Sequence, residues 1–193
     1  MKIMISNNIS SALISSIVLY VLILCLSIFI FISNFYLLFQ INVRLKLIRK
    51  ENLLYLYNQK NYLIVLFNSL FDFVLLIIVS VIFSLYINQN ISNKYYLFEI
   101  CVIIKIINVI LLYFLNPKLI KTILVINTTK YLIFSNTLIE LEKIFSIRFE
   151  NKTFKKVVIN YFDQNNNKEQ IKLYINKNLE KWFKDNLNKY IKD

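Results

Sequence analysis

The chain of 193 residues contains no glycine and no histidine, and Pro117 is its single proline. Glycine lets the backbone approach a phosphate group closely, and histidine is the usual general base and the commonest metal ligand. Their absence excludes glycine-rich phosphate loops, the nucleophile elbow, the standard calcium-binding loop and the two-histidine zinc motif. We therefore expect a protein without enzymatic activity, catalytic residues, metal or cofactor.

Cysteine and alanine are also scarce. Cys25 and Cys101 lie far apart inside apolar runs, which indicates neither a disulfide framework nor a zinc site. Asparagine and lysine are abundant, whereas alanine is nearly absent and glycine is absent. This bias is typical of a very AT-rich genome. The net charge of +12 is spread along the chain and does not indicate a nucleic-acid partner.

Charged residues are absent between Lys2 and Arg44, and 58% of the chain is hydrophobic. An apolar helix of about 20 residues crosses a bilayer. Three segments meet this condition, and helices are expected at about 10–39, 62–87 and 96–115. The sequence therefore predicts a transmembrane domain at 1–116, with the lipid bilayer as its surroundings, and a cytoplasmic domain at 117–193.

Basic residues orient these spans, because lysine and arginine stay on the cytoplasmic side of a membrane. The predicted loop 41–60 carries five of them against one acid, whereas loop 88–94 carries only Lys94. We expect the N-terminus outside and the C-terminal domain inside a bacterial plasma membrane, or alternatively an organellar inner membrane. The candidates for contact with anionic lipid headgroups in the inner loop are Arg44, Lys46, Arg49 and Lys50.

Three charges interrupt the predicted spans; Glu99 lies near the outer end of the third, whereas Asp72 and Lys105 lie at corresponding depths. Asp72 lies ten residues after Tyr62, and Lys105 lies ten residues before Leu115. At about 1.5 Å of rise per residue, each is roughly 15 Å from the cytoplasmic edge. Charges inside a bilayer are costly and tend to pair. The sequence thus predicts an intramembrane ion pair that locks two helices together, and a proton or ion relay is the alternative.

The pattern changes after Asn116, where apolar and polar residues begin to alternate in short runs such as Phe145–Phe149 and Ile171–Ile175. This period of two predicts about six half-buried strands. A helical period follows over Leu179–Ile191, with Trp182 on its apolar face. The predicted fold class is α+β: three transmembrane helices, then a small antiparallel β domain closed by an amphipathic helix. At one predicted β-hairpin, further candidates for headgroup contact are Lys152, Lys155 and Lys156.

Membrane helices, a proline, a meander of strands and a closing helix resemble the bacterial pleckstrin-homology-like (PH-like) membrane proteins. The stretch Ile139–Ile147 keeps the apolar positions of a family motif, with Leu141 in place of its tryptophan and Lys143 in place of its aspartate. Val157–Ile175 is similar to the last hairpin of the family. The resemblance covers roughly residues 117–191 and implies a membrane-tethered interaction domain without enzymatic activity.

Three functions remain open on the sequence. The preferred one is a non-enzymatic membrane protein that binds lipid headgroups, a protein partner or its own copies. The first alternative is an accessory subunit of an organelle-encoded respiratory or ATP synthase complex, which the composition also suits. The second alternative is a small transporter, which depends on Asp72 and Lys105 alone.

Overall fold

The computed structural model describes residues 2–89, 92–135, 137–151 and 155–192. Contacts between residues divide the chain into two compact units. One unit combines Met1–Tyr36 with Leu66–Phe114, and the other combines Leu37–Val65 with Leu115–Asp193. Each unit is therefore built from two separate stretches of sequence.

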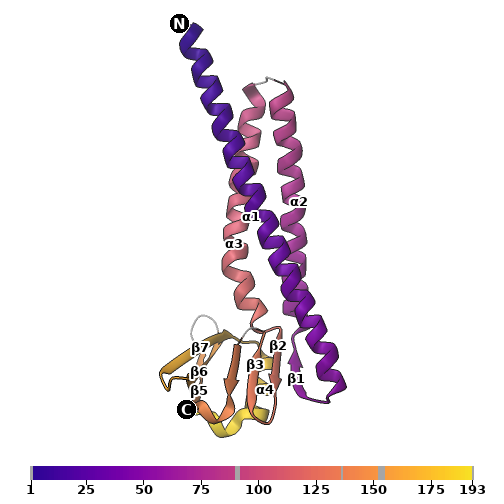
Figure 1. Cartoon of the computed structure of the whole chain (residues 1–193), viewed down its shortest axis with the longest axis vertical. Helices are drawn as coiled ribbons and strands as arrows, with labels where there is room; N and C mark the ends of the chain where they lie inside the picture. The colour runs from indigo at the N-terminus through magenta and orange to yellow at the C-terminus, as the bar shows by residue number, and fades with distance from the viewer. Residues whose placement is uncertain (1, 90–91, 136, 152–154, 193) are drawn as a thin grey trace. The chain divides into compact units, whose positions relative to one another are not determined.

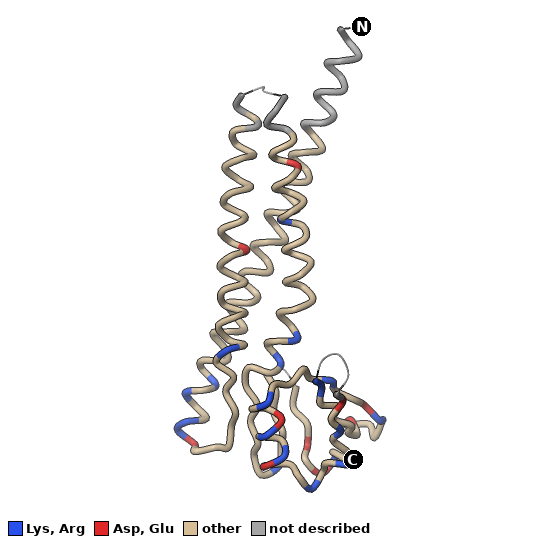
Figure 2. Tube along the Cα trace, turned by 180° about the vertical axis from the view of Figure 1, so that it is seen from behind, with Lys and Arg blue, Asp and Glu red and all other residues tan. Residues whose placement is uncertain are grey.

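Three long helices carry most of the apolar residues (Figure 1): α1 (Lys2–Lys50), α2 (Gln59–Gln89) and α3 (Ser92–Ile120). Each is long and apolar enough to cross a membrane. Charged residues are sparse along most of their length (Figure 2). All three extend beyond the predicted segments.

Helix α3 does not end at Leu115, the predicted limit of the third span, and Pro117 lies within its last turn. A proline removes one backbone donor from a helix. The Pro117 carbonyl still accepts a hydrogen bond from the backbone N–H of Lys121, so the turn that follows the proline closes.

The buried positions of α2 and α3 recur at intervals of three and four residues. This spacing is typical of helices that pack along one seam, as in coiled coils. In α2 the positions are Ser69, Asp72, Leu76, Val79 and Phe83, and in α3 they include Phe98, Val102, Lys105 and Leu112. Both charged residues of the predicted pair therefore lie on the packed faces of their helices.

The second unit contains two antiparallel sheets. Strands β2 (Leu124–Asn127), β3 (Tyr131–Phe134) and β4 (Thr137–Glu140) form consecutive hairpins. Strands β5 (Ile144–Asn151), β6 (Lys155–Phe162) and β7 (Lys168–Tyr174) form the second sheet, in that order. The number of these strands agrees with the prediction, and β5 and β7 overlap the alternating runs Phe145–Phe149 and Ile171–Ile175.

A seventh strand, β1 (Leu54–Tyr57), completes the first sheet, whose order is β1-β2-β3-β4. The prediction of a loop over 41–60 is therefore wrong, because α1 continues to Lys50 and β1 follows a turn. Asn52 makes this turn with a positive φ of 52°, a conformation that asparagine tolerates better than most residues. Strand β1 is separated in sequence from all other strands, and it depends on its pairing with β2.

Helix α4 (Lys177–Leu187) closes the core of this unit. The Asn176 side chain caps it by accepting a hydrogen bond of 2.8 Å from the backbone N–H of Leu179. Its apolar face is buried with both sheets and comprises Leu179, Trp182, Phe183 and Leu187. The predicted burial of Trp182 is confirmed. The helix ends earlier than predicted, since Ile191 forms an isolated bridge with Ile147 of β5.

Candidate functional site

Asp72 and Lys105, which the sequence singled out, are in contact in the helical unit. Lys105 Nζ lies 2.6 Å from Asp72 Oδ1 and donates a second hydrogen bond of 2.6 Å to the Asp72 carbonyl oxygen. Asn108 Nδ2 donates to the same Oδ1 over 2.7 Å. The two charged residues are 1% and 0% exposed. A buried charge needs such partners, because removal from water is costly.

The same unit contains polar contacts that were not predicted. Asn34 Nδ2 of α1 donates a hydrogen bond of 3.0 Å to Ser69 Oγ of α2, one helical turn from Asp72. Tyr20 donates to Ser80 Oγ over 2.9 Å. Each contact joins α1 to α2. The signal in the sequence was the presence of polar residues within otherwise apolar helices, where interhelical hydrogen bonds hold neighbours together.

The four basic candidates at 44–50 lie in the last turns of α1 and not in a loop. Arg44 donates a hydrogen bond to the backbone carbonyl of Ser135, at the end of β3. Arg49 and Lys50 lie in the final turn, where a positive charge interacts favourably with the carbonyl end of the helix dipole. The hydrogen bond of Arg44 thus stabilises the fold. Lys46, Arg49 and Lys50 are exposed to the surroundings of the protein.

The predicted lysine cluster at the β-hairpin divides between two surroundings. Lys155 Nζ lies 3.2 Å from Glu180 Oε2 of α4. Lys156 Nζ lies 5.0 Å from the centre of the Tyr174 ring on β7. Successive residues of a strand point to opposite faces, so these two lysines do not form one patch. Lys152, the third member, lies outside the described residues.

Hydrogen bonds from Lys184 and Lys155 hold the pKa of the Glu180 carboxyl below its ordinary value. Glu180 thereby forms two ion pairs, one of 3.0 Å with Lys184 of its own helix α4 and one of 3.2 Å with Lys155 of β6. On another part of the domain, burial and the neighbouring Glu169 raise the pKa of Tyr161 to about 12. Neither group is poised to exchange a proton near neutral pH.

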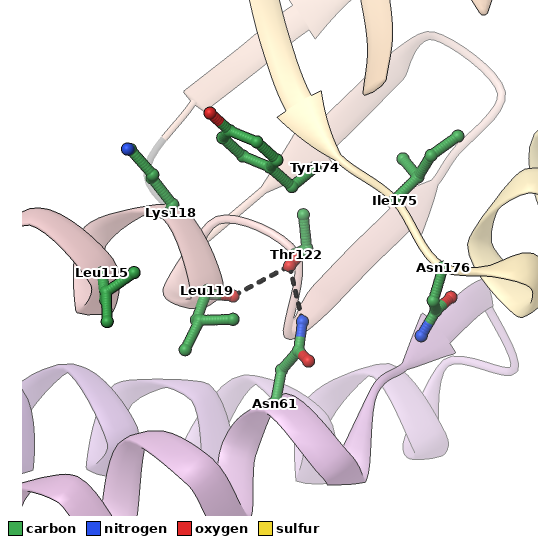
Figure 3. A pocket seen from close by; sticks show the side chains of 8 residues that line it. All are labelled: Asn61, Leu115, Lys118, Leu119, Thr122, Tyr174, Ile175 and Asn176. Carbon is green, nitrogen blue, oxygen red and sulfur yellow. Dashed lines mark hydrogen bonds between the residues drawn. The ribbon is translucent and has the colours of Figure 1, made fainter. Parts of the chain in front are cut away.

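A cavity of about 340 Å³ opens in the second unit, at a place that sequence reasoning did not identify (Figure 3). Its walls come from the first turn of α2, from the end of α3 and the turn after it, and from the last residue of β7 with the segment that follows. The lining residues are Asn61, Leu115, Lys118, Leu119, Thr122, Tyr174, Ile175 and Asn176. They are distant in sequence, and the pairing of β1 with β2 helps to bring the start of α2 beside them.

Hydrogen bonds fix one side of this cavity. Asn61 Nδ2 donates to Thr122 Oγ1 over 2.8 Å, and Thr122 Oγ1 donates to the Leu119 carbonyl over 2.9 Å. Both bonds are drawn in Figure 3. Asn58 accepts a hydrogen bond from the Asn61 backbone N–H and donates its own N–H to the Ile123 carbonyl over 2.7 Å. The start of α2 and the end of α3 are thus joined.

No group of three or more metal-binding side chains occurs among the described residues. Comparisons of the chain with models of protein families, with curated proteins and with solved structures found no match. The arguments for its function therefore depend on its own geometry.

Proposed function

We propose that this chain is an integral membrane protein with three spans and a cytoplasmic PH-like domain, which binds lipid headgroups or a protein partner without catalysing a reaction. One observation carries the proposal. Strand β1, which lies between the first and second apolar helices, pairs with β2, which follows the third. If α2 and α3 cross a bilayer, β1 and β2 are on the same side. The basic residues before β1 and those of the C-terminal domain favour the cytoplasmic side for both strands.

The sheets support the PH-like assignment. The resemblance depends on a meander of antiparallel strands that a C-terminal helix closes. Strands β2 to β7 follow one another as antiparallel neighbours within two sheets, and α4 buries its apolar face on both. A fold of this kind offers its loops and sheet edges for binding, and a membrane anchor keeps it near its ligand.

The contacts of the charged residues favour a binding role over transport. Lys105 is held by two oxygen atoms of Asp72, and Asn108 occupies the same carboxylate oxygen. A relay must release and rebind its ion, whereas this arrangement holds the ammonium group in place. We assign the pair a structural role.

Purification of the full chain from membranes in a mild detergent, followed by mass spectrometry of bound lipids and proteins, tests the proposal. We expect enrichment of anionic lipid or of one stoichiometric partner. Phe183→Asp, which disrupts the core of the domain but leaves the three apolar helices unchanged, should lose this enrichment. Stoichiometric recovery of respiratory or ATP synthase subunits would instead favour the accessory-subunit alternative.

A further inference from the structure

From the cavity formed by α2, α3 and the end of β7, we infer a binding site for the phosphate group of an anionic phospholipid headgroup. Lys118, which lines the cavity, and Lys156, which lies beside the same Tyr174 ring, supply the positive charge for this phosphate. The inference rests on the proposed membrane location and adds the site and the chemical class of its ligand.

The first argument is the charge beside the cavity. Lys118 Nζ lies 5.4 Å and Lys156 Nζ lies 5.0 Å from the centre of the same Tyr174 ring. Figure 3 shows Lys118 and Tyr174 together on one wall. The aromatic ring attracts both cations but neutralises neither. An anion bound beside this ring would supply the missing charge.

The second argument is that neither lysine is neutralised by an ion pair, unlike three other lysines of this domain. Within the described residues, Lys143, Lys155 and Lys184 each lie 3.0 to 3.2 Å from a glutamate oxygen. Lys118 and Lys156 have no carboxylate within ion-pair distance in the same part of the chain. Glu150 lies opposite Lys156 in the ladder of β5 and β6 but forms no such ion pair with it, so both ammonium groups remain available to a ligand.

The third argument is the apolar wall. Leu115 and Leu119 lie one turn apart on α3 and line the cavity below Lys118. Leu115 is 47% exposed, which is unfavourable in water but suits contact with the first carbons of an acyl chain. A cationic rim beside an apolar wall is complementary to a phospholipid, whose phosphate is attached to acyl chains through glycerol.

The fourth argument is position and size. The cavity lies at the first turn of α2 and the last turns of α3, where the two proposed spans meet the cytoplasmic surface. Anionic lipids attract basic residues at this level of a membrane. A volume of about 340 Å³ falls within the range of ligand pockets, and the Asn61–Thr122 hydrogen bond keeps the walls together without a ligand.

The test uses the full chain in detergent micelles, with phosphatidylglycerol added as the probe and phosphatidylcholine as the uncharged comparison. Native mass spectrometry measures the bound lipid. The double variant Lys118→Gln with Lys156→Gln should bind phosphatidylglycerol about thirtyfold more weakly, since each basic residue near a membrane contributes about 1 kcal/mol. The variant with arginine at both positions should retain binding.

Lys121→Gln with Lys172→Gln is the matched control, because it removes the same charge from two exposed lysines that neither line the cavity nor lie over the Tyr174 ring. Unchanged binding in this control supports the site, and an equal loss would overturn it in favour of unspecific attraction. Displacement of the lipid by soluble glycerol phosphate would overturn the lipid as ligand. Trp182 fluorescence establishes that each variant is folded.

The accessibility of the chain to labelling reagents separates the two proposals. If the helices insert with three spans but the Lys118/Lys156 variant binds phosphatidylglycerol as tightly as the parent, the site is wrong and the proposed function stands. If the helices do not insert, both are wrong.

Discussion

Leu56 of β1 lies directly opposite Val125 of β2 in an antiparallel ladder, although the whole of α2 and α3 separates these residues in sequence. Val125 is fully buried, and Leu56 packs against the core around it. The sheet-bearing unit thus cannot be complete without a strand that precedes two of the three apolar helices. A fragment that begins at residue 117 would lack this strand.

Leu56→Asp should destabilise the sheet-bearing unit by about 2–3 kcal/mol, because it removes apolar burial and places a carboxylate against the core. Leu54→Asp is the matched control in the same strand, since Leu54 is 56% exposed. Resistance of the full chain to protease at rising temperature measures the difference. Equal resistance of the two variants would show that β1 does not contribute to the core.

Trp182→Ala should destabilise the unit by about 3–5 kcal/mol, the usual cost of truncating a large buried aromatic side chain. Trp182 lies on the buried face of α4 and contacts the Phe183 ring edge-on. Lys181→Ala, at the exposed neighbouring position, should have little effect. The same protease assay measures the difference. If the Trp182→Ala chain is as resistant as the Lys181→Ala chain, α4 does not pack on the core through Trp182.

Asp72→Leu and Lys105→Leu should each reduce the abundance and detergent stability of the protein, because each strands a buried charge. The double variant should lose less than the sum of the two single losses, since no unpaired charge remains. A melting series in one detergent measures all three variants beside the parent. Strictly additive losses would mean that the contact does not stabilise the bundle.

Acidification should destabilise the packing of α4, because it protonates the carboxylate of Glu180. Its pKa is lower in the folded state than in the unfolded chain, so its contribution to stability is present above the unfolded pKa and is lost as the pH falls through the folded pKa. Trp182 is the single tryptophan, and its emission reports on α4. Between pH 6 and pH 3 the thermal midpoint followed by this emission should fall further in the parent than in Glu180→Gln, and an identical fall would contradict the assignment.

The sequence predicted α4 and about six strands after Asn116, because runs such as Phe145–Phe149 follow a period of two and Leu179–Ile191 follows a helical period. It also predicted that Asp72 and Lys105 share a depth, because two isolated charges in apolar segments are conspicuous. Helix ends were harder to predict, since hydropathy marks where a helix is apolar and not where its hydrogen bonds stop. Helix α1 therefore continues through Arg44 and Lys46 without any change of backbone.

Two features could not be predicted from the sequence, because they depend on long-range contacts. Strand β1 is separated in sequence from all other strands, so only its long-range partner identifies it. The cavity beside Tyr174 joins residues from α2, α3 and β7 that no local pattern connects. Both depend on contacts across a large sequence separation, which composition and periodicity do not record.

The central claim is that α2 and α3 cross the membrane and return, so that β1 and the C-terminal domain lie on one side. Single cysteines at Leu54, Gln89 and Asn165, in a chain without Cys25 and Cys101, test it with a membrane-impermeant thiol reagent on intact cells. We predict labelling at position 89 without permeabilisation, and labelling at positions 54 and 165 only after it. Labelling of 54 and 165 from opposite sides, or of all three from one side, would contradict the claim.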